Sequence, residues 1–182
     1  MSHQQGGFLG RLKRLVTGGG PEGRLRVQMQ FQARMFADSY NVGYAMEAEQ
    51  RKADGLPVRP FDSSPASLGE VDALVLGLLH GDPGTREAVD QGLFVTGAGA
   101  YYGEVIVRHL GGQWEARSPE GAAPTGGQAI QAGALQVSGI GGGDVAERPL
   151  LRVLERVNSQ DAPSLQSAFE DLKRRSGAGP AT

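Results

Sequence analysis

A glycine cluster within residues 93–110 (LFVTGAGAYYGEVIVRHL) combines residue types and a spacing that could do chemistry. An apolar run, the glycines and an amphipathic run follow one another, an order typical of the strand, turn and helix of a dinucleotide site. In such a site, glycines let the backbone approach a pyrophosphate held at the helix N-terminus. Here Gly97, Gly99 and Gly103 are spaced one residue too wide for the G-x-G-x-x-G pattern.

Thr96, Gly97 and Gly103 make the stretch similar to the Thr-Gly-x-x-x-Gly-x-Gly opening of short-chain dehydrogenases. It departs from that family at Tyr101, whose side chain would occupy the space that a phosphate needs, and the family's Tyr-x-x-x-Lys pair has no counterpart. A helix explains the same residues, because glycines four apart on one face permit the close approach of another element. We favour the helix over the nucleotide site.

Four residues near the cluster are candidate binding residues: Tyr101, Glu104, Arg108 and Trp114. Glu104 lies among aromatic and apolar neighbours, and Arg108 follows it at the spacing of an ion pair along a helix. We favour a structural ion pair. A binding or acid–base role for Glu104 is the alternative, because partly buried carboxylates are where pKa shifts arise.

No residue qualifies as catalytic. The chain has no cysteine, and its three histidines, at positions 3, 80 and 109, are too dispersed to bind a metal. The sequence contains no Gly-x-Ser-x-Gly nucleophile elbow and no glycine-rich loop followed by Lys-Ser/Thr. We therefore expect no catalytic set, no metal site and no cofactor.

The elements that position these residues indicate a mostly helical α+β single domain. Helices are expected from Ser67 to the turn at 81–84 and over 85–110, 150–157 and 164–175, with a Ser67–Glu70 capping box and a cap at Ser164. Residues 73–79 are apolar nearly all round, which is typical of a core helix. Strands at 114–117 and 134–138, the second ended by the glycines at 139–143, predict a small antiparallel sheet in the C-terminal half.

Residues 24–53 carry an ambiguous pattern. Strict alternation over 24–33 is the strand signal, whereas leucine, methionine, glutamine and arginine are good helix formers. We lean towards a helix, which would have two opposed apolar stripes. One stripe contains Val27, Phe31, Met35, Val42 and Met46, and the other contains Met29, Phe36, Tyr40 and Tyr44. Two stripes need more cover than one small domain readily gives, so we expect a homodimer.

The N-terminal residues 1–23 read as an amphipathic basic segment and a glycine-rich tether. Residues 1–26 hold five basic side chains and one acidic one, a net charge of +4 in a chain whose total is -2. Between the glycines on either side, apolar and basic residues recur at helical spacing: Phe8, Leu12 and Leu15, with Arg11, Lys13 and Arg14. Two interpretations of residues 8–16 stay open, a frayed terminus and a docking helix. The docking helix would bind a protein groove or an anionic membrane surface.

Residues 65–114 resemble a group of uncharacterised bacterial domains of unknown function. The resemblance is carried by the order Pro-Ala-Ser-Leu, an Asp-led helix, Gly-Ala-Tyr-x-Gly-Glu at 99–104 and Leu-Gly-Gly-x-Trp at 110–114. It covers about 50 of the 182 residues and implies a small α+β domain without a known activity. The three parts of the chain are then 1–23, a globular domain at 24–175 and a disordered tail at 176–182.

These observations favour a non-enzymatic protein-interaction or regulatory protein with an N-terminal docking helix. A small-molecule or nucleotide-binding enzyme that uses Gly97–Gly103 is the alternative. A pI near 5.9 argues against a nucleic-acid partner, and no stretch approaches the length of a membrane span. We expect a cytoplasmic protein with a protein partner, in contact with the inner membrane face if residues 8–16 dock there.

Overall fold

The computed structural model describes five stretches of the chain: 20–46, 48–55, 60–80, 91–117 and 132–177. Their helices are α2 (Pro21–Met46), α3 (Ala48–Ala53), α4 (Leu68–His80), α6 (Gln91–Leu110), α7 (Pro149–Asn158) and α8 (Leu165–Arg175). Their strands are β1 (Gln113–Ala116), β2 (Leu135–Ile140) and β3 (Val145–Glu147), and short 3-10 turns lie at Pro65–Ser67 and Ala132–Ala134. The prediction of a mostly helical α+β fold with a small C-terminal-half sheet is confirmed.

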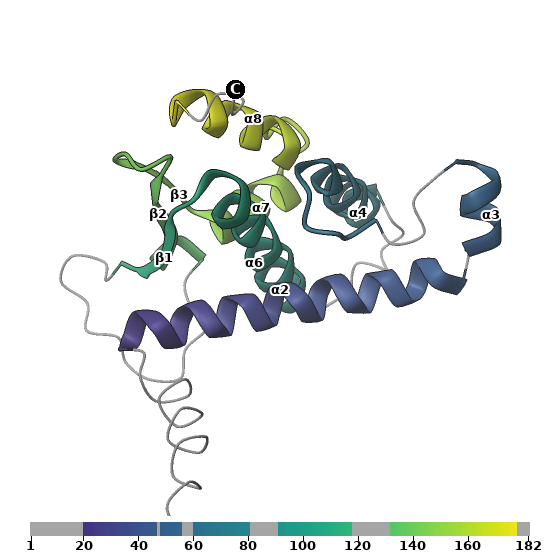
Figure 1. Ribbon diagram of the computed structural model, residues 1–182. Coiled ribbons are helices and arrows are strands. Elements are labelled where there is room, and N and C mark those ends of the chain that lie inside the picture. Colours follow the sequence, from purple (N-terminus) through teal and green to yellow (C-terminus); the bar gives the residue numbers. More distant parts are fainter. Residues whose placement is uncertain (1–19, 47, 56–59, 81–90, 118–131, 178–182) are drawn as a thin grey trace, which may run out of the picture.

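The long helix α2 runs along one edge of the molecule, and the other elements all lie on the same side of this helix (Figure 1). It is helical throughout, so the helical interpretation of residues 24–33 is confirmed and the strand interpretation is wrong. The alternation over 24–33 does not produce a strand, because Met29, Ala33 and Phe36 recur at helical spacing and are buried together on one face of the helix. The helix begins at Pro21, inside the segment that we expected to be tether.

Helix α6 lies at the centre of the fold, between α2 and α7, and most of its residues are buried. Gly97 faces the ring of Phe36 on α2, and Gly99 faces Leu150 on α7. Glycine is required on these sides because a Cβ at Gly99 would lie only 2.7 Å from the Leu150 Cα. We expected the helix from residue 85; its part before Gln91 lies outside the described residues.

The sheet is a three-stranded antiparallel meander in the order β1-β2-β3. Trp114 on β1 lies opposite Val137 on β2, and both are buried against the helices. β2 extends to Ile140, two residues beyond the expected end. Gly141 and Gly142 have positive φ and form the turn that leads into β3. The sequence analysis did not predict the strand β3.

The start of α4 differs from the capping box that we expected. The side chain of Ser64 accepts a hydrogen bond from the Ser67 N–H at 3.3 Å and caps a 3-10 turn, because Pro65 favours the first helical position. Glu70 instead lies 3.6 Å from Arg51 of α3. As expected of a core helix, α4 buries Val71 and Val75 in the core, but its other side, with Ala73 and Gly77, is exposed.

The two C-terminal helices lie within one residue of their expected bounds. Ser164 caps α8 as predicted, since its side chain accepts a hydrogen bond from the Ser167 N–H at 3.1 Å. Asp72 of α4 holds the same helix end, accepting the backbone N–H groups of Leu165 at 2.9 Å and Gln166 at 3.3 Å. Within the described helices, none combines the length and the apolar composition that a membrane span requires.

Candidate functional site

The four predicted binding residues all lie on α6 or at its exit into the sheet, but they do not form one site. Tyr101 and Trp114 are buried, Glu104 is partly buried and Arg108 is exposed. Tyr101 faces the loop before α4, whereas Trp114 and Glu104 face one another on the sheet side of the helix. The structure therefore divides them between two internal contacts.

The hydroxyl of Tyr101 is hydrogen-bonded to the loop that precedes α4. Its hydroxyl accepts the Ser63 N–H at 2.8 Å and lies 2.7 Å from the Ser67 Oγ. Ser63 has a φ of 62°, in the left-handed region that residues other than glycine rarely adopt, and His109 Nε2 lies 2.9 Å from its carbonyl oxygen. Burial raises the pKa of Tyr101, so the hydroxyl remains a neutral partner for these groups.

Substitution of Tyr101 by phenylalanine is expected to lower the free energy of unfolding by about 1–3 kcal/mol, because the Ser63 N–H loses its acceptor in a partly buried place. Tyr40→Phe is the matched control, since this half-buried tyrosine makes no hydrogen bond through its hydroxyl within the described residues. Its cost should stay within about 0.5 kcal/mol. Urea unfolding measures both; equal costs would show that the Tyr101 hydroxyl does not hold the loop.

Glu104 does not pair with Arg108, so the structural ion pair that we favoured is wrong. Its Oε1 accepts the indole N–H of Trp114 at 2.8 Å instead. The charge of Arg108 acts on Asp62: burial alone raises the pKa of this carboxyl, but the hydrogen bonds from Ser64 and the Arg108 charge lower it overall. Glu104 and Arg108 lie one turn apart on the same face of α6, and the Trp114 indole N–H takes the place at the Glu104 carboxylate that Arg108 was expected to fill.

The glycine cluster contacts protein groups in place of a ligand. Residues 91–110 form one helix rather than a strand, a turn and a helix. Gly97 faces Phe36, Gly99 faces Leu150, and a Cβ at Gly103 would overlap the six-membered ring of Trp114. This geometry agrees with the close-approach interpretation, and it leaves no open face at these glycines for a pyrophosphate.

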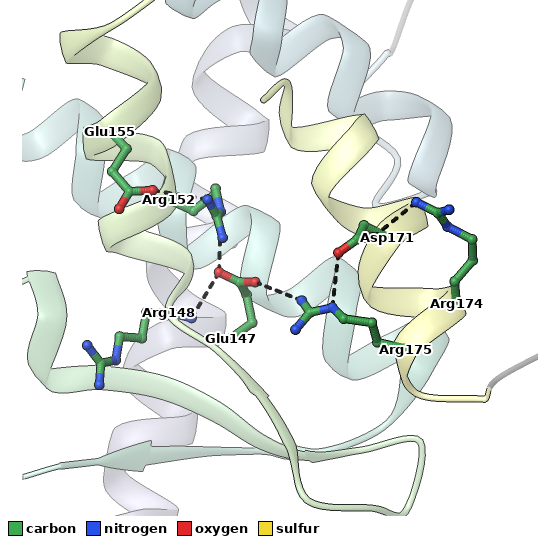
Figure 2. Close-up of polar contacts among 7 residues, drawn as sticks. All are labelled: Glu147, Arg148, Arg152, Glu155, Asp171, Arg174 and Arg175. Atoms are coloured by element: carbon green, nitrogen blue, oxygen red, sulfur yellow. Dashed lines mark hydrogen bonds and ion pairs between the residues drawn. The ribbon is translucent and has the colours of Figure 1, made fainter. Parts of the chain in front are cut away.

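A pocket of about 310 Å³ lies where β3, α7 and α8 meet. Its main charged residues are Arg117, Arg148, Arg152, Arg175, Glu147 and Glu155. Figure 2 shows the Glu147 carboxylate between two of these arginines: Arg152 Nε at 3.5 Å and Arg175 Nη2 at 4.0 Å. The Arg148 backbone N–H also donates to this carboxylate, at 3.1 Å. The lining of the pocket therefore carries a net positive charge around the buried Glu147 carboxylate, whose charge is balanced by the two arginines.

The chemistry available in this pocket is electrostatic. Tyr102 is buried and does not line the pocket; burial, together with the Glu147 charge, raises the pKa of its phenol far above the usual range, so this phenol stays protonated and cannot act as a base. Arg152 also forms an ion pair with Glu155 at 3.1 Å, and Arg175 forms one with Asp171 at 3.0 Å. Within the described residues, no group of histidines and carboxylates could hold a metal ion. The ion pairs join β3 to α7 and α8.

Among the described residues, a row of apolar side chains lies exposed on the solvent face of α2, and we call it the α2 stripe. It contains Val27, Phe31, Met35, Val42 and Met46, with exposed fractions of 64%, 59%, 49%, 66% and 88%. The opposite row is covered by the domain, since Met29 and Phe36 are buried and Tyr40 and Tyr44 partly so. Both stripes of the sequence analysis are therefore present, and the part of the chain that the structure describes covers one of them.

Sequence reasoning found the α2 stripe and missed the Glu147 pocket. The stripe depends on helical periodicity alone, which a sequence displays directly. Glu147 stands in the short segment VAE, which carries no motif, and its arginines come from two later helices. The six predicted docking residues, Phe8, Leu12, Leu15, Arg11, Lys13 and Arg14, lie outside the described residues, so the docking helix stays a prediction.

No protein-family model, curated protein or solved structure matches the chain. The resemblance of residues 65–114 to uncharacterised bacterial domains also stays a prediction.

Proposed function

We propose that this protein is a non-enzymatic protein-interaction or regulatory protein and that the α2 stripe is its main contact surface. One observation carries the proposal: five large apolar side chains lie in a row on the solvent face of a single helix. Single exposed apolar residues are ordinary on protein surfaces, whereas a contiguous apolar patch marks a binding surface.

The covered face of α2 supports this role because it fixes the stripe in place. Phe36 packs against Phe94 of α6 with ring centroids 5.9 Å apart. Asn41 exchanges hydrogen bonds with the backbone of Phe61, at 3.1 Å and 3.2 Å. A surface that is ordered before binding loses less conformational entropy on association.

The alternative is a small-molecule or nucleotide-binding enzyme that uses Gly97–Gly103. The contacts of these glycines with Phe36, Leu150 and Trp114 weigh against it, as does the internal use of the hydroxyl of Tyr101 and the carboxylate of Glu104. Residues 8–16 remain part of the proposal as a second docking element, for a protein groove or an anionic membrane.

A photo-crosslinking amino acid at Phe31 tests the interaction role in cells that produce the full chain. We expect a crosslinked protein product from this position, because Phe31 lies in the middle of the stripe. The matched control is the same amino acid at Glu170, an exposed position of α8 away from α2, where no specific product is expected. Absence of a product at Phe31, or equal products at both positions, would contradict the proposed function.

A further inference from the structure

Four of the five residues of the α2 stripe are placed symmetrically along the helix, and the position that mirrors the fifth, Met35, is Asp38. The midpoint of Val27 and Met46 coincides with the midpoint of Phe31 and Val42, between Phe36 and Ala37. Two copies of such a helix, related by a two-fold axis through that midpoint, place each end of one stripe against the opposite end of the other. A two-fold interface requires this self-complementarity, because the same surface must match itself.

The two charges beside the stripe have opposite signs and lie close to this midpoint. Arg34 and Asp38 are both exposed, lie 3.4 Å apart as an ion pair, and stand on either side of the midpoint. In an antiparallel pair, Arg34 of each copy comes next to Asp38 of the other. A parallel pair would not bring Arg34 of one copy next to Asp38 of the other, because residues of the same number then lie at the same height along the interface.

We infer that the α2 stripe binds a second copy of this chain, with the two α2 helices antiparallel. Phe31 of one copy then packs against Val42 of the other, Val27 packs against Met46, and two Arg34–Asp38 pairs cross the interface. The inference rests on the proposed interaction role and names its partner.

Residues 8–16 of the same chain do not fit the stripe as well. As a docking helix, nine residues reach about 13.5 Å, whereas the stripe from Val27 to Met46 spans about 28 Å. They also carry three basic side chains to the end of α2 that holds Arg24 and Arg26. Like charges would therefore meet, and more than half of the stripe would stay uncovered.

Sedimentation equilibrium of the full chain tests the second copy. We expect a dimer at tens of micromolar that dissociates on dilution. Phe31→Asp should raise the dimer Kd at least about tenfold, since both copies then bring a charge to the interface. The conservative Phe31→Leu should stay dimeric. Because Phe31 is exposed within one chain, circular dichroism should show both variants folded, which separates loss of binding from loss of fold.

Charge variants give a second readout. Arg34→Glu makes both positions acidic and Asp38→Arg makes both basic, so each variant alone should dimerise less tightly. A mixture of the two should recover the dimer, which a folding defect could not explain. Failure of the mixture to associate more tightly than either variant would overturn the inference.

Disulfide mapping tests the relative direction of the two α2 helices. Because the chain has no native cysteine, only the introduced cysteines can form a crosslink. A mixture of Val27→Cys and Met46→Cys should form a crosslinked dimer on oxidation, because these positions face one another in the antiparallel pair. Val27→Cys alone should not, since its two copies would lie about 28 Å apart. A Val27→Cys homodimer would overturn the antiparallel arrangement. A chain that stays monomeric overturns the inference, and the Phe31 crosslink in cells then decides separately whether another protein binds there.

Discussion

Trp114→Ala is expected to lower the free energy of unfolding by about 3–5 kcal/mol, the range for a large aromatic side chain removed from a core. Trp114 is only 2% exposed and covers α6 at Gly103. Its loss also removes the indole N–H that Glu104 accepts at 2.8 Å. Because it is the chain's only tryptophan, the wild-type transition can be followed by its fluorescence and the variant's by circular dichroism.

The contact between Trp114 and Gly103 can be isolated by a double-mutant cycle. Gly103→Ala alone should cost about 1–3 kcal/mol, since its Cβ would overlap the indole ring and lie 3.1 Å from Pro149 Cγ. In a Trp114→Leu background the overlap disappears, so the same alanine should cost much less. Additive effects would show that the two residues do not contact one another in solution.

Gly77 of α4 provides the matched control for the glycine substitution. It lies within a helix and is exposed, and beyond its own helical turns no atom lies within 4 Å of the position that an added Cβ would take. Gly77→Ala should therefore raise the free energy of unfolding by about 0.5–1 kcal/mol through helix propensity alone. The gain should be the same in the Trp114→Leu background. The same chemical change thus has opposite signs at Gly77 and Gly103.

Features set by local periodicity could be predicted from the sequence. The two faces of α2 follow from the repeat of Val27 and Phe31 on one side and Met29 and Phe36 on the other, and both are present. Ser164 caps α8 because a serine ahead of an amphipathic run needs only its own neighbours. The homodimer and the docking helix stay predictions.

Features set by contacts between elements could not be predicted. Glu104 was expected to pair with Arg108, four residues away, yet the turn at Gly111 and Gly112 brings Trp114 back onto α6. Strand β3 has three residues, too few for an alternating pattern, and it is defined by pairing with β2. The neighbours that neutralise Glu147 come from α7 and α8 and become visible only in the folded chain.

Asp72→Ala is expected to cost about 3–5 kcal/mol of unfolding free energy, because it removes one partner of a buried ion pair. The Asp72 carboxylate lies 3.7 Å from Arg156 Nε and accepts the backbone N–H groups of Leu165 and Gln166. Asp72 and Arg156 are each 7% exposed. Alanine would leave the guanidinium and both N–H groups without these interactions, so the start of α8 would separate from α4.

Asp72→Asn separates the charge of this residue from its hydrogen bonding. Burial raises the pKa of Asp72 despite its hydrogen bonds and Arg156, which means that the folded protein favours the neutral carboxyl more than the unfolded chain does. Asparagine is neutral and keeps an acceptor for the Leu165 N–H. Its cost at about pH 7 should therefore be smaller than that of alanine, about 1–2 kcal/mol.

The raised pKa also fixes the sign of the pH dependence. A carboxyl whose pKa is higher in the folded state contributes stability that is complete below its unfolded pKa and is lost as the pH rises through the folded value. On going from about pH 7 to about pH 4, the wild type should therefore gain stability relative to Asp72→Asn. Urea unfolding of both proteins at each pH measures this difference. A relative loss at the lower pH would mean that the charged carboxylate, rather than its neutral form, is the one that the fold prefers.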